Sequence, residues 1–248
     1  MALPSVEAFE RAGLEAWPGV DVKWDGAWVR RAAGGYTKRA NSVQCLDPDD
    51  GEDADLRVIS GSTWMVMRGI KPTFRITPLA APELVETLDD AGWQSIDHSH
   101  LFAMELGEQQ ADAETKLFPV LDTTFLAVQR QLKGYDDATM AGMRGLLTAL
   151  AVPATGIVTY RDGEPVASGL MAIADAIVIT GNVITDPGRR RQGLGAAMMR
   201  TGLDWARSKG ATTAALNVEA SNPAGQALYH SLGYTHQYDY TYRIPGAQ

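Results

Sequence analysis

One stretch of this 248-residue chain constrains its fold more than any other. From residue 176 an apolar, β-branched run leads to an Asp-Pro-Gly turn at 186–188, and a long helical pattern starts at 192–195 with the sequence Gln-Gly-Leu-Gly. The run predicts a strand and a turn, and the apolar period after it predicts a helix that ends at Gly210. The chain therefore contains a strand–turn–helix unit, which is typical of the α/β class.

The turn of this unit has the chemistry of an anion site. Three arginines at 189–191 precede Gly193 and Gly195. A helix N-terminus presents unpaired backbone N–H groups and a partial positive charge, and glycine lets a ligand approach the backbone closely. These features predict a cradle for a phosphate or pyrophosphate group. A P-loop is excluded because no Gly-Lys-Ser/Thr follows, and the dinucleotide fingerprint fails because Met198 stands where its third glycine would be.

Composition and charge exclude several classes of protein. Hydrophobic residues make up 45% and charged residues 21% of the chain, which is the mix of a globular protein rather than a disordered or fibrous one. The net charge of −8 argues against a nucleic-acid partner. The first 20 residues do not resemble a targeting segment, and no apolar run approaches the ~18 residues that span a bilayer. Cys45 is the only cysteine, so we expect a cytoplasmic protein with no disulfide and no membrane partner.

Charge is spread unevenly, which suggests two units. Residues 1–113 hold 10 basic and 19 acidic residues, whereas residues 114–248 hold 12 and 11. The acidic residues concentrate at 47–55. A calcium loop that began at Asp47 would need Gly at its sixth and Glu at its twelfth position, but Glu52 and Val58 stand there. We therefore interpret the segment as a solvated loop. The polar segment 107–116 is the best linker candidate and places the domain boundary between residues 112 and 113.

Periodicity and turn signals predict an alternation of helices and strands. Helices are expected at 5–16, 53–68, 82–90, 118–133, 136–150, 192–209 and 222–232. Strands are expected at 24–31, 42–46, 74–77, 95–106, 154–160, 165–174, 176–185, 212–218 and 234–244. There is also a faint internal repeat, because 74–93 and 215–234 share the order strand, proline turn, helix and Gly-aromatic pair. Which half the last strand packs on is left open.

Several correctly spaced residues in the second half resemble one known family. The stretch 190–195 (Arg-Arg-Gln-Gly-Leu-Gly) is similar to motif A of the GCN5-related N-acetyltransferases, the GNAT family, which has the form Arg/Gln-x-x-Gly-x-Gly/Ala. Downstream, Asn222, the pair Leu-Tyr at 228–229 and the pair Gly-Tyr at 233–234 match the family pattern at the right spacing. Gly225 departs from the alanine that is usual there. The resemblance covers about residues 176–236.

The resemblance implies acetyl-CoA as co-substrate. The pantetheine arm would pair with the backbone of Val183, Ile184 and Thr185 as an added strand does. The turn would hold the pyrophosphate through Arg190, Arg191, Gln192, Gly193, Leu194, Gly195 and Ala196. Asn222 would lie near the pantetheine or the thioester. Tyr229 occupies the family position that protonates the leaving thiolate, and such general-acid help is worth about 10²–10⁴-fold.

Direct attack of an amine on a thioester needs a base, because a protonated amine is no nucleophile. Glu164, Asp175 and Glu219 are candidates by location, and the resemblance does not choose among them. Cys45 is not expected to be a covalent nucleophile, since it lies outside the matching region and direct transfer needs no acyl-enzyme.

The four histidines do not suggest a metal set. His98 and His100 share one face of a predicted strand, but His230 and His236 are far away in sequence. The chain has no His-Glu-x-x-His motif and no cysteine partner for them. We therefore expect no metal cofactor.

The first half is expected to be a degenerate GNAT-like domain. It has a similar order of strands and helices but no Arg-x-x-Gly-x-Gly, so it should not bind CoA in the same way. Its segment 34–42 (Gly-Gly-Tyr-Thr-Lys-Arg-Ala-Asn-Ser) is similar to one in a subgroup of bacterial GNAT proteins. We interpret it as a substrate or interdomain loop in which Lys38 and Arg39 face an acid; the alternative is a solvated turn that leads into a strand.

The expected fold is α/β, with two GNAT-like units, 1–112 and 113–248, each a mixed, mostly antiparallel β-sheet flanked by helices. The expected function is transfer of an acetyl group from acetyl-CoA directly to a primary amine of a small molecule, by a monomer or a homodimer. Two alternatives stay open. One is a protein N-terminal or lysine acetyltransferase, and the other is a non-catalytic module that binds acyl-CoA without turnover.

Overall fold

The computed structural model describes residues 2–246 and joins eleven strands into one mixed sheet. The strand order is β1-β2-β3-β4-β11-β5-β10-β9-β8-β7-β6. The strands are β1 (Asp21–Asp25), β2 (Trp28–Ala32), β3 (Val43–Cys45), β4 (Phe74–Ile76), β5 (Gln94–Glu105), β6 (Thr115–Phe118), β7 (Ala154–Arg161), β8 (Glu164–Ala174), β9 (Ile177–Thr185), β10 (Thr213–Glu219) and β11 (Thr235–Ile244).

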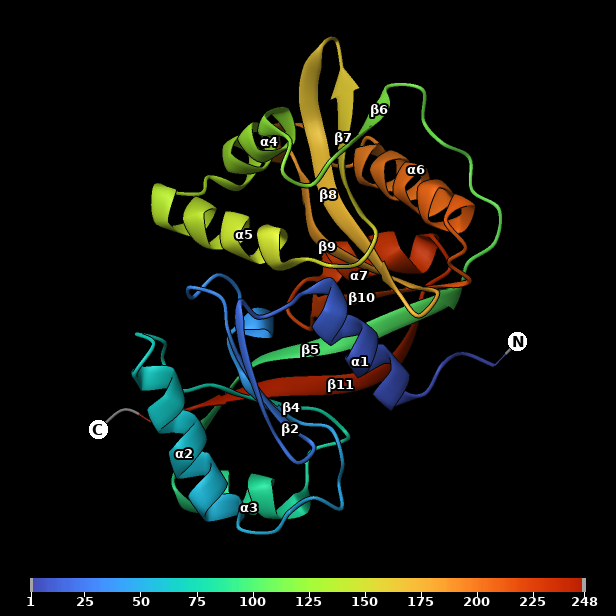
Figure 1. Ribbon diagram of the computed structural model, residues 1–248. Helices are drawn as coiled ribbons and strands as arrows, with labels where there is room; N and C mark the ends of the chain where they lie inside the picture. The colour runs from blue at the N-terminus through green and yellow to red at the C-terminus, as the bar shows by residue number, and fades with distance from the viewer. Residues whose placement is uncertain (1, 247–248) are drawn as a thin grey trace.

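Seven α-helices in the described range cover the two faces of this sheet (Figure 1). They are α1 (Val6–Ala16), α2 (Ala54–Val66), α3 (Pro82–Asp90), α4 (Thr123–Lys133), α5 (Asp137–Ala149), α6 (Leu194–Ser208) and α7 (Pro223–Ser231). Helices α6 and α7 pack on one face through a core that includes Phe102, Met198 and Leu203. Helices α1, α4 and α5 cover the other face, and α2 and α3 pack against β2, β3 and β4. None of the helices within residues 2–246 combines the length and the apolar character needed to cross a bilayer.

The two segments of the predicted repeat are both present, and they are interleaved. One is β4–α3–β5 and the other is β10–α7–β11. Strand β5 pairs antiparallel with both β10 and β11, and β11 also pairs antiparallel with β4. In Figure 1, green β5 and red β11 run side by side through the middle of the molecule. The last strand of the chain, β11, therefore lies between two strands of the first half, β4 and β5.

This pairing between strands of the two halves bears on the expected organisation into two units. Strand β5 belongs to residues 1–112, yet it lies between two strands of residues 113–248. Helix α1 likewise packs on β8 and β9 of the second half. The sheet therefore does not divide at residue 112, and one continuous sheet replaces the two separate sheets that we expected. We keep two GNAT-like units with a boundary at 112/113 as a proposal, which the reciprocal pairing of the two β–α–β segments supports.

Two short strands differ from the sequence-based expectation. The segment 24–31, predicted as one strand, belongs to a hairpin of β1 and β2 that turns at Gly26 with φ +59. The segment 115–118 was assigned to the end of the linker and the start of a helix, but it forms the edge strand β6. Helix α4 begins only after Asp122, whose carboxylate accepts hydrogen bonds from the first amides of the helix and so caps it.

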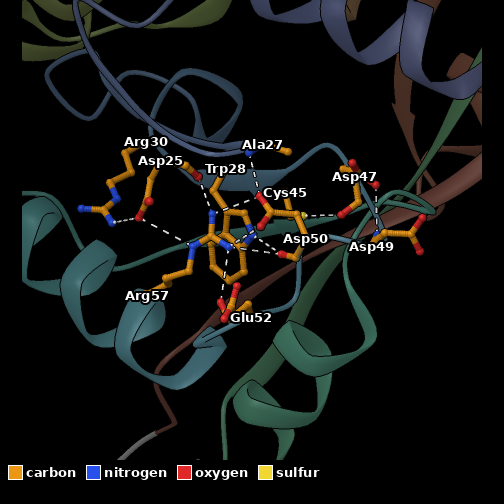
Figure 2. A network of polar contacts seen from close by, with 10 residues as sticks. All are labelled: Asp25, Ala27, Trp28, Arg30, Cys45, Asp47, Asp49, Asp50, Glu52 and Arg57. Atoms are coloured by element: carbon orange, nitrogen blue, oxygen red, sulfur yellow. Dashed lines mark hydrogen bonds and ion pairs between the residues drawn. The ribbon is translucent and has the colours of Figure 1, made fainter.

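The acidic loop at 47–55 is only partly solvated, because one of its carboxylates folds inward (Figure 2). Asp50 accepts a hydrogen bond from the backbone N–H of Ala27 at 2.7 Å and pairs with Arg57 Nη1 at 2.7 Å. The hydrogen bond from Arg57 lowers the pKa of Asp50. The Arg57 guanidinium also lies 4.4 Å above the ring of Trp28. The loop therefore ties the β1–β2 hairpin to α2.

Candidate functional site

Two parallel strands part in the middle of the sheet. β9 and β10 pair from Ile177 and Thr213 as far as Thr180 and Leu216, and not beyond. β9 continues alongside β8 to Thr185, with a bulge at Asn182, whose φ is +54. The predicted pantetheine-binding residues 183–185 follow this bulge, where β9 no longer pairs with β10. A strand edge of this kind is what an extended ligand needs in order to add itself to a sheet.

The turn after β9 leaves the start of α6 open. Gly193 occupies the N-cap position with φ +75 and offers no side chain to the first amides of the helix. Arg191 also adopts a left-handed conformation, with φ +62. Residues 190–193 are exposed, so the side chains of Arg190, Arg191 and Gln192 face solvent next to the uncapped start of α6. This arrangement provides the donors and the positive charge of an anion cradle.

The second glycine of the turn has a packing role. A Cβ on Gly195 would lie 3.2 Å from Leu228 Cδ2 and 3.2 Å from Thr185 Oγ1. Gly195 therefore lets α6 approach both β9 and α7, which brings the cradle next to the parted strands. Leu194 is buried in the α6 core and Ala196 is half-buried, so these two predicted residues can offer a ligand only their backbone.

Tyr229 lies on α7 with a buried ring that is 8% exposed and edge-on to Tyr234. Burial raises the pKa of Tyr229 to about 12, and the positive charge of Arg39 opposes that rise. Between residues 2 and 246 its hydroxyl makes no hydrogen bond. The hydroxyl is thus protonated at neutral pH and free to donate.

Asn222 is exposed and caps α7, its Oδ1 accepting a hydrogen bond from Gly225 N at 2.9 Å. The unusual glycine at 225 explains how the side chain folds back so closely. A Cβ at residue 225 would stand 2.7 Å from Asn222 Nδ2 and 3.0 Å from its Cγ. In this structure the side-chain oxygen of Asn222 is engaged in the cap, which leaves its amide nitrogen for a ligand.

An open cleft of about 250 Å³ lies beside the parted strands. Its lining comes from both halves of the chain and consists of Thr37, Lys38, Arg39, Asp97, Ser99, Asn217, Glu219, Tyr240 and Tyr242. The segment 34–42 forms one wall. It is held to the second half by Tyr36, whose hydroxyl accepts a 2.6 Å hydrogen bond from Asn182. The segment thus contacts residues of both halves of the chain, and within it Lys38 faces an acid, Asp97, at 2.8 Å.

Of the three candidate bases, Glu219 is the one that lines this cleft. Glu164 begins β8 at the exposed β7–β8 turn, and Asp175 sits in the β8–β9 turn with φ +46. Burial, and then the charge of Arg39, lower the pKa of Lys133, whereas Glu219 acts to raise it. Lys133 also donates to the Val183 carbonyl at 3.1 Å. These groups therefore share one electrostatic environment at the point where β9 and β10 part.

A smaller cavity of about 20 Å³ shares Arg39 and Asn217 with the cleft. Its other polar wall residues are Glu10, Arg31, Gln44 and Arg75. We call it the arginine cavity. Arg31 is 3% exposed and donates through Nη1 to the Trp17 carbonyl at 3.1 Å, while its Nε has no partner within the described part of the chain. Burial, aided by the nearby charge of Arg75, lowers the pKa of Arg31 to about 10.

Sequence reasoning missed the arginine cavity. The available signal was the presence of Arg31 and Arg75 inside predicted strands, since charged side chains are seldom buried without a partner. Cys45, by contrast, fits the expectation that it is not a nucleophile. Its buried thiol donates to the Asp47 carbonyl at 3.0 Å, and burial raises its pKa.

Comparison with known proteins gives matches along nearly the whole chain. The family model described as "Probable histone acetyltransferase Rv0428c C-terminal" matches residues 4–243. The uncharacterized N-acetyltransferase YobR of Bacillus subtilis is 23% identical over 248 residues, which covers 98% of this chain and 99% of that protein. The probable histone acetyltransferase Rv0428c of Mycobacterium tuberculosis is 26% identical over 239 residues, or 93% of this chain and 70% of that protein. A shorter match joins 53 residues, 21% of this chain, to 36% of the [ribosomal protein bS18]-alanine N-acetyltransferase of Escherichia coli, with 45% identity.

Solved structures share the architecture. A GCN5-related N-acetyltransferase from Kribbella flavida superimposes with a TM-score of 0.74 at 20% identity, covering 99% of this chain and 98% of that one. A tandem GNAT protein from the clavulanic acid biosynthesis pathway has a TM-score of 0.64 at 11% identity, covering 89% and 78%. At these identities the likeness establishes the fold, while function has to be argued from the site.

Proposed function

The chain belongs to the family of the Rv0428c C-terminal region, with the fold of the GCN5-related N-acetyltransferases, and from this premise we propose that it transfers the acetyl group of acetyl-CoA directly to a primary amine. The proposal rests chiefly on one observation. Where β10 parts from β9 it lines an open cleft with Asn217 and Glu219, and the charge of Arg39 in the same cleft acts on the hydroxyl of Tyr229.

In this proposal acetyl-CoA binds to residues of the second half of the chain. The pantetheine arm pairs with the backbone of 183–185, and the pyrophosphate accepts hydrogen bonds from the amides of 191–196. The exposed side chains of Arg190 and Arg191 add positive charge. Because the oxygen of Asn222 caps α7, its amide nitrogen is the atom that would contact the pantetheine arm. The thioester then lies where the strands part, within reach of both the cleft and Tyr229.

The proposed chemistry uses two groups, Glu219 and Tyr229. Glu219 takes a proton from the amine, directly or through a water molecule, and the neutral amine attacks the carbonyl carbon. The C–S bond then breaks, and the sulfur leaves with the electron pair. The Tyr229 hydroxyl holds its proton more tightly than an alkyl thiol, whose pKa is about 8.5. Its main contribution is therefore a hydrogen bond to the developing thiolate. The nitrogen of the tetrahedral intermediate loses its extra proton as the C–S bond breaks, and one proton is taken up by the sulfur, directly or through Tyr229 and solvent, so that the products are the amide and CoA–SH and the Tyr229 hydroxyl is protonated again.

The acceptor class follows from the charge around the cleft. Arg39 lines both the cleft and the arginine cavity, and the buried Arg31 of that cavity forms no ion pair within the described residues. An unpaired buried charge is costly, and a bound anion offsets that cost. We therefore assign a small amine that also carries a carboxylate, with the amine toward Glu219 and the carboxylate toward Arg39 and Arg31.

A second candidate has one specific observation in its favour. The 53-residue match to the [ribosomal protein bS18]-alanine N-acetyltransferase raises a protein N-terminus as the acceptor. The segment 34–42 forms a wall of the cleft and favours a small substrate over a protein tail. The two candidates are separated by measuring acetylation of a peptide that begins with Ala and of a set of small amines with and without carboxylates.

The decisive experiment is calorimetric titration of the purified protein with acetyl-CoA, with NAD and ATP as controls, followed by thiol release in the presence of each amine. Micromolar binding of acetyl-CoA alone, together with turnover of a small amine, is the expected result. Binding without turnover of any amine or peptide would favour a non-catalytic acyl-CoA module. If acetyl-CoA does not bind, the anion cradle is not functional and the proposal is wrong.

A further inference from the structure

Three of the four histidines gather around one carboxylate where β5 and β11 pair. Asp239 Oδ1 lies 2.6 Å from His100 Nδ1 and 2.6 Å from His236 Nε2, and Asp239 Oδ2 lies 3.5 Å from His98 Nε2. The nearest ligand atoms of His98, His100 and Asp239 are all within 4.8 Å of one another. We call these four residues the histidine cluster. Distance along the chain was one of the reasons for expecting no metal site, and the pairing of β5 with β11 removes that reason for His236.

Irregularities in the two strands build this cluster. Along β11 the register moves from His236 opposite Phe102 to Tyr238 opposite Leu101, so β11 contains one extra residue there. Residues three apart on a regular strand point to opposite faces, but this bulge turns His236 and Asp239 to the same face. A second irregularity lies in β5 beside His98, where Asp97 has φ +51. Bulges of this kind commonly serve to re-aim side chains.

From this geometry we propose that the histidine cluster binds a zinc ion through His98, His100 and Asp239, with a water molecule in the fourth position. Two imidazole nitrogens and one carboxylate oxygen are a ligand set that suits Zn²⁺, whereas Mg²⁺ and Ca²⁺ require oxygen ligands. His236 lies 2.6 Å from the same carboxylate and orients it. Donor atoms at about 2.0–2.1 Å from a tetrahedral zinc stand about 3.3 Å apart. The 2.6 Å hydrogen bond between Asp239 and His100 must open by less than 1 Å to reach that separation.

The zinc site is distinct from the acetyl-transfer site. Side chains alternate between the faces of a strand, so the cleft residues Asp97 and Ser99 point away from the face that carries His100. The ligands come from β5 of the first half and β11 of the second. The ion would therefore link β5 and β11, the last strands of the two β–α–β segments. Its expected role is structural and independent of acetyl transfer.

The test uses the full chain without a polyhistidine tag. The protein is equilibrated with ZnCl₂, dialysed against metal-free buffer and analysed by mass spectrometry for zinc, and its affinity is measured by titration calorimetry, with MgCl₂ as a control. The expected result is about one zinc per chain for the wild type and a zinc-dependent rise in Tm. His230→Ala is the matched control, because this exposed histidine lies outside the cluster and contacts the Tyr234 carbonyl.

Two variants decide the outcome. His100→Ala and Asp239→Asn should each weaken zinc binding by at least about tenfold, since each removes a ligand, and Asp239→Asn should abolish the rise in Tm. Asp239→Asn keeps the size and exposed position of the side chain, so it should fold normally. The proposal is overturned if the wild type takes up no zinc, or if both variants bind zinc with wild-type stoichiometry and affinity.

Discussion

Arg75 and Glu10 form an ion pair in the interior of the protein, with Nη2 2.9 Å from Oε1 and both side chains 4% exposed. The pair joins β4 to α1. Gln44 and Tyr238 complete the shell of the carboxylate with hydrogen bonds of 2.7 and 2.6 Å. A buried charge is tolerated only when it is paired and hydrogen-bonded, so this network also fixes how α1 lies on the sheet.

Glu10→Gln should destabilise the fold, and the effect should depend on pH. Burial alone raises the pKa of Glu10, but the charge of Arg75 and the hydrogen bonds from Arg75, Tyr238 and Gln44 together outweigh it, and the pKa is lowered overall. The carboxylate therefore stabilises the fold fully above its unfolded pKa of about 4.3, and this stabilisation is lost as the pH falls through the lower folded value. Urea unfolding at pH 7 should show a loss of about 3–5 kcal/mol, the usual cost of breaking a buried pair.

Glu7→Gln on the same helix is the control, because its pair with Arg11 is exposed and worth at most about 1 kcal/mol. The difference between wild type and Glu10→Gln should shrink steadily below pH 4. A gap that stays constant from pH 7 to pH 3 would contradict the assignment of the stabilisation to the ionised carboxylate.

The elements that follow local rules could be predicted from the sequence. The hairpin at 162–163, the strand–turn–helix unit at 176–209 and both β–α–β segments are where turn residues and periodicity place them. Strand β6 could not be found this way, because its four residues alternate too briefly and form an edge beside β7. The pairing of β5 with β11 is also hidden, since strand register across more than 130 residues leaves no local signal.

The same limit applies to the sites. The cradle at 190–196 is contiguous in sequence, so its glycines and arginines predict it. The arginine cavity and the histidine cluster are assembled from strands distant in sequence. Arg39 in the first half and Glu219 in the second therefore could not be placed in one cleft before the topology was known.

Gly195→Val tests the cradle. The two 3.2 Å neighbours of a Cβ at residue 195 leave no room for a branched side chain, so α6 must shift away from β9 and α7. Titration should show acetyl-CoA affinity reduced by at least about tenfold, equivalent to 1.4 kcal/mol. Gly188→Val in the same turn is the control, because a Cβ there has only Asp186 Oδ1 near it, at 3.5 Å, and should change the affinity less than twofold. Equal losses in the two variants would argue against a specific role for Gly195.

Tyr229→Phe separates catalysis from binding. The hydroxyl is the group assigned to the leaving thiolate, so kcat should fall at least about tenfold while the Kd of acetyl-CoA stays within twofold. Because the pKa of Tyr229 is raised to about 12, its hydroxyl stays protonated through pH 10, and ionisation of Tyr229 should not lower the wild-type rate between pH 8 and pH 10. Unchanged turnover in the variant would show that Tyr229 is not the donor.

Glu219→Gln tests the base. The amide cannot accept the proton of the ammonium group, so kcat/KM for the amine should fall by about 10²-fold or more at pH 7. The loss should shrink as the pH approaches the pKa of the amine, where the neutral form no longer needs a base. Glu164→Gln is the control at a site outside the cleft and should leave the rate unchanged. A rate loss of similar size in Glu164→Gln, or none in Glu219→Gln, would reject this choice of base.

Arg39→Met tests the acceptor class. Methionine keeps much of the apolar contact with Trp17, whose ring the guanidinium covers at 4.4 Å, but it removes the charge offered to a carboxylate. For an amine that carries a carboxylate, KM should rise at least about tenfold, and for its methyl ester the change should stay below about threefold, because the ester has no charge to lose. Arg11→Met on the exposed face of α1 controls for the loss of a positive charge elsewhere. If Arg39→Met affects acid and ester equally, Arg39 does not read the carboxylate, and the acceptor is defined by its amine alone.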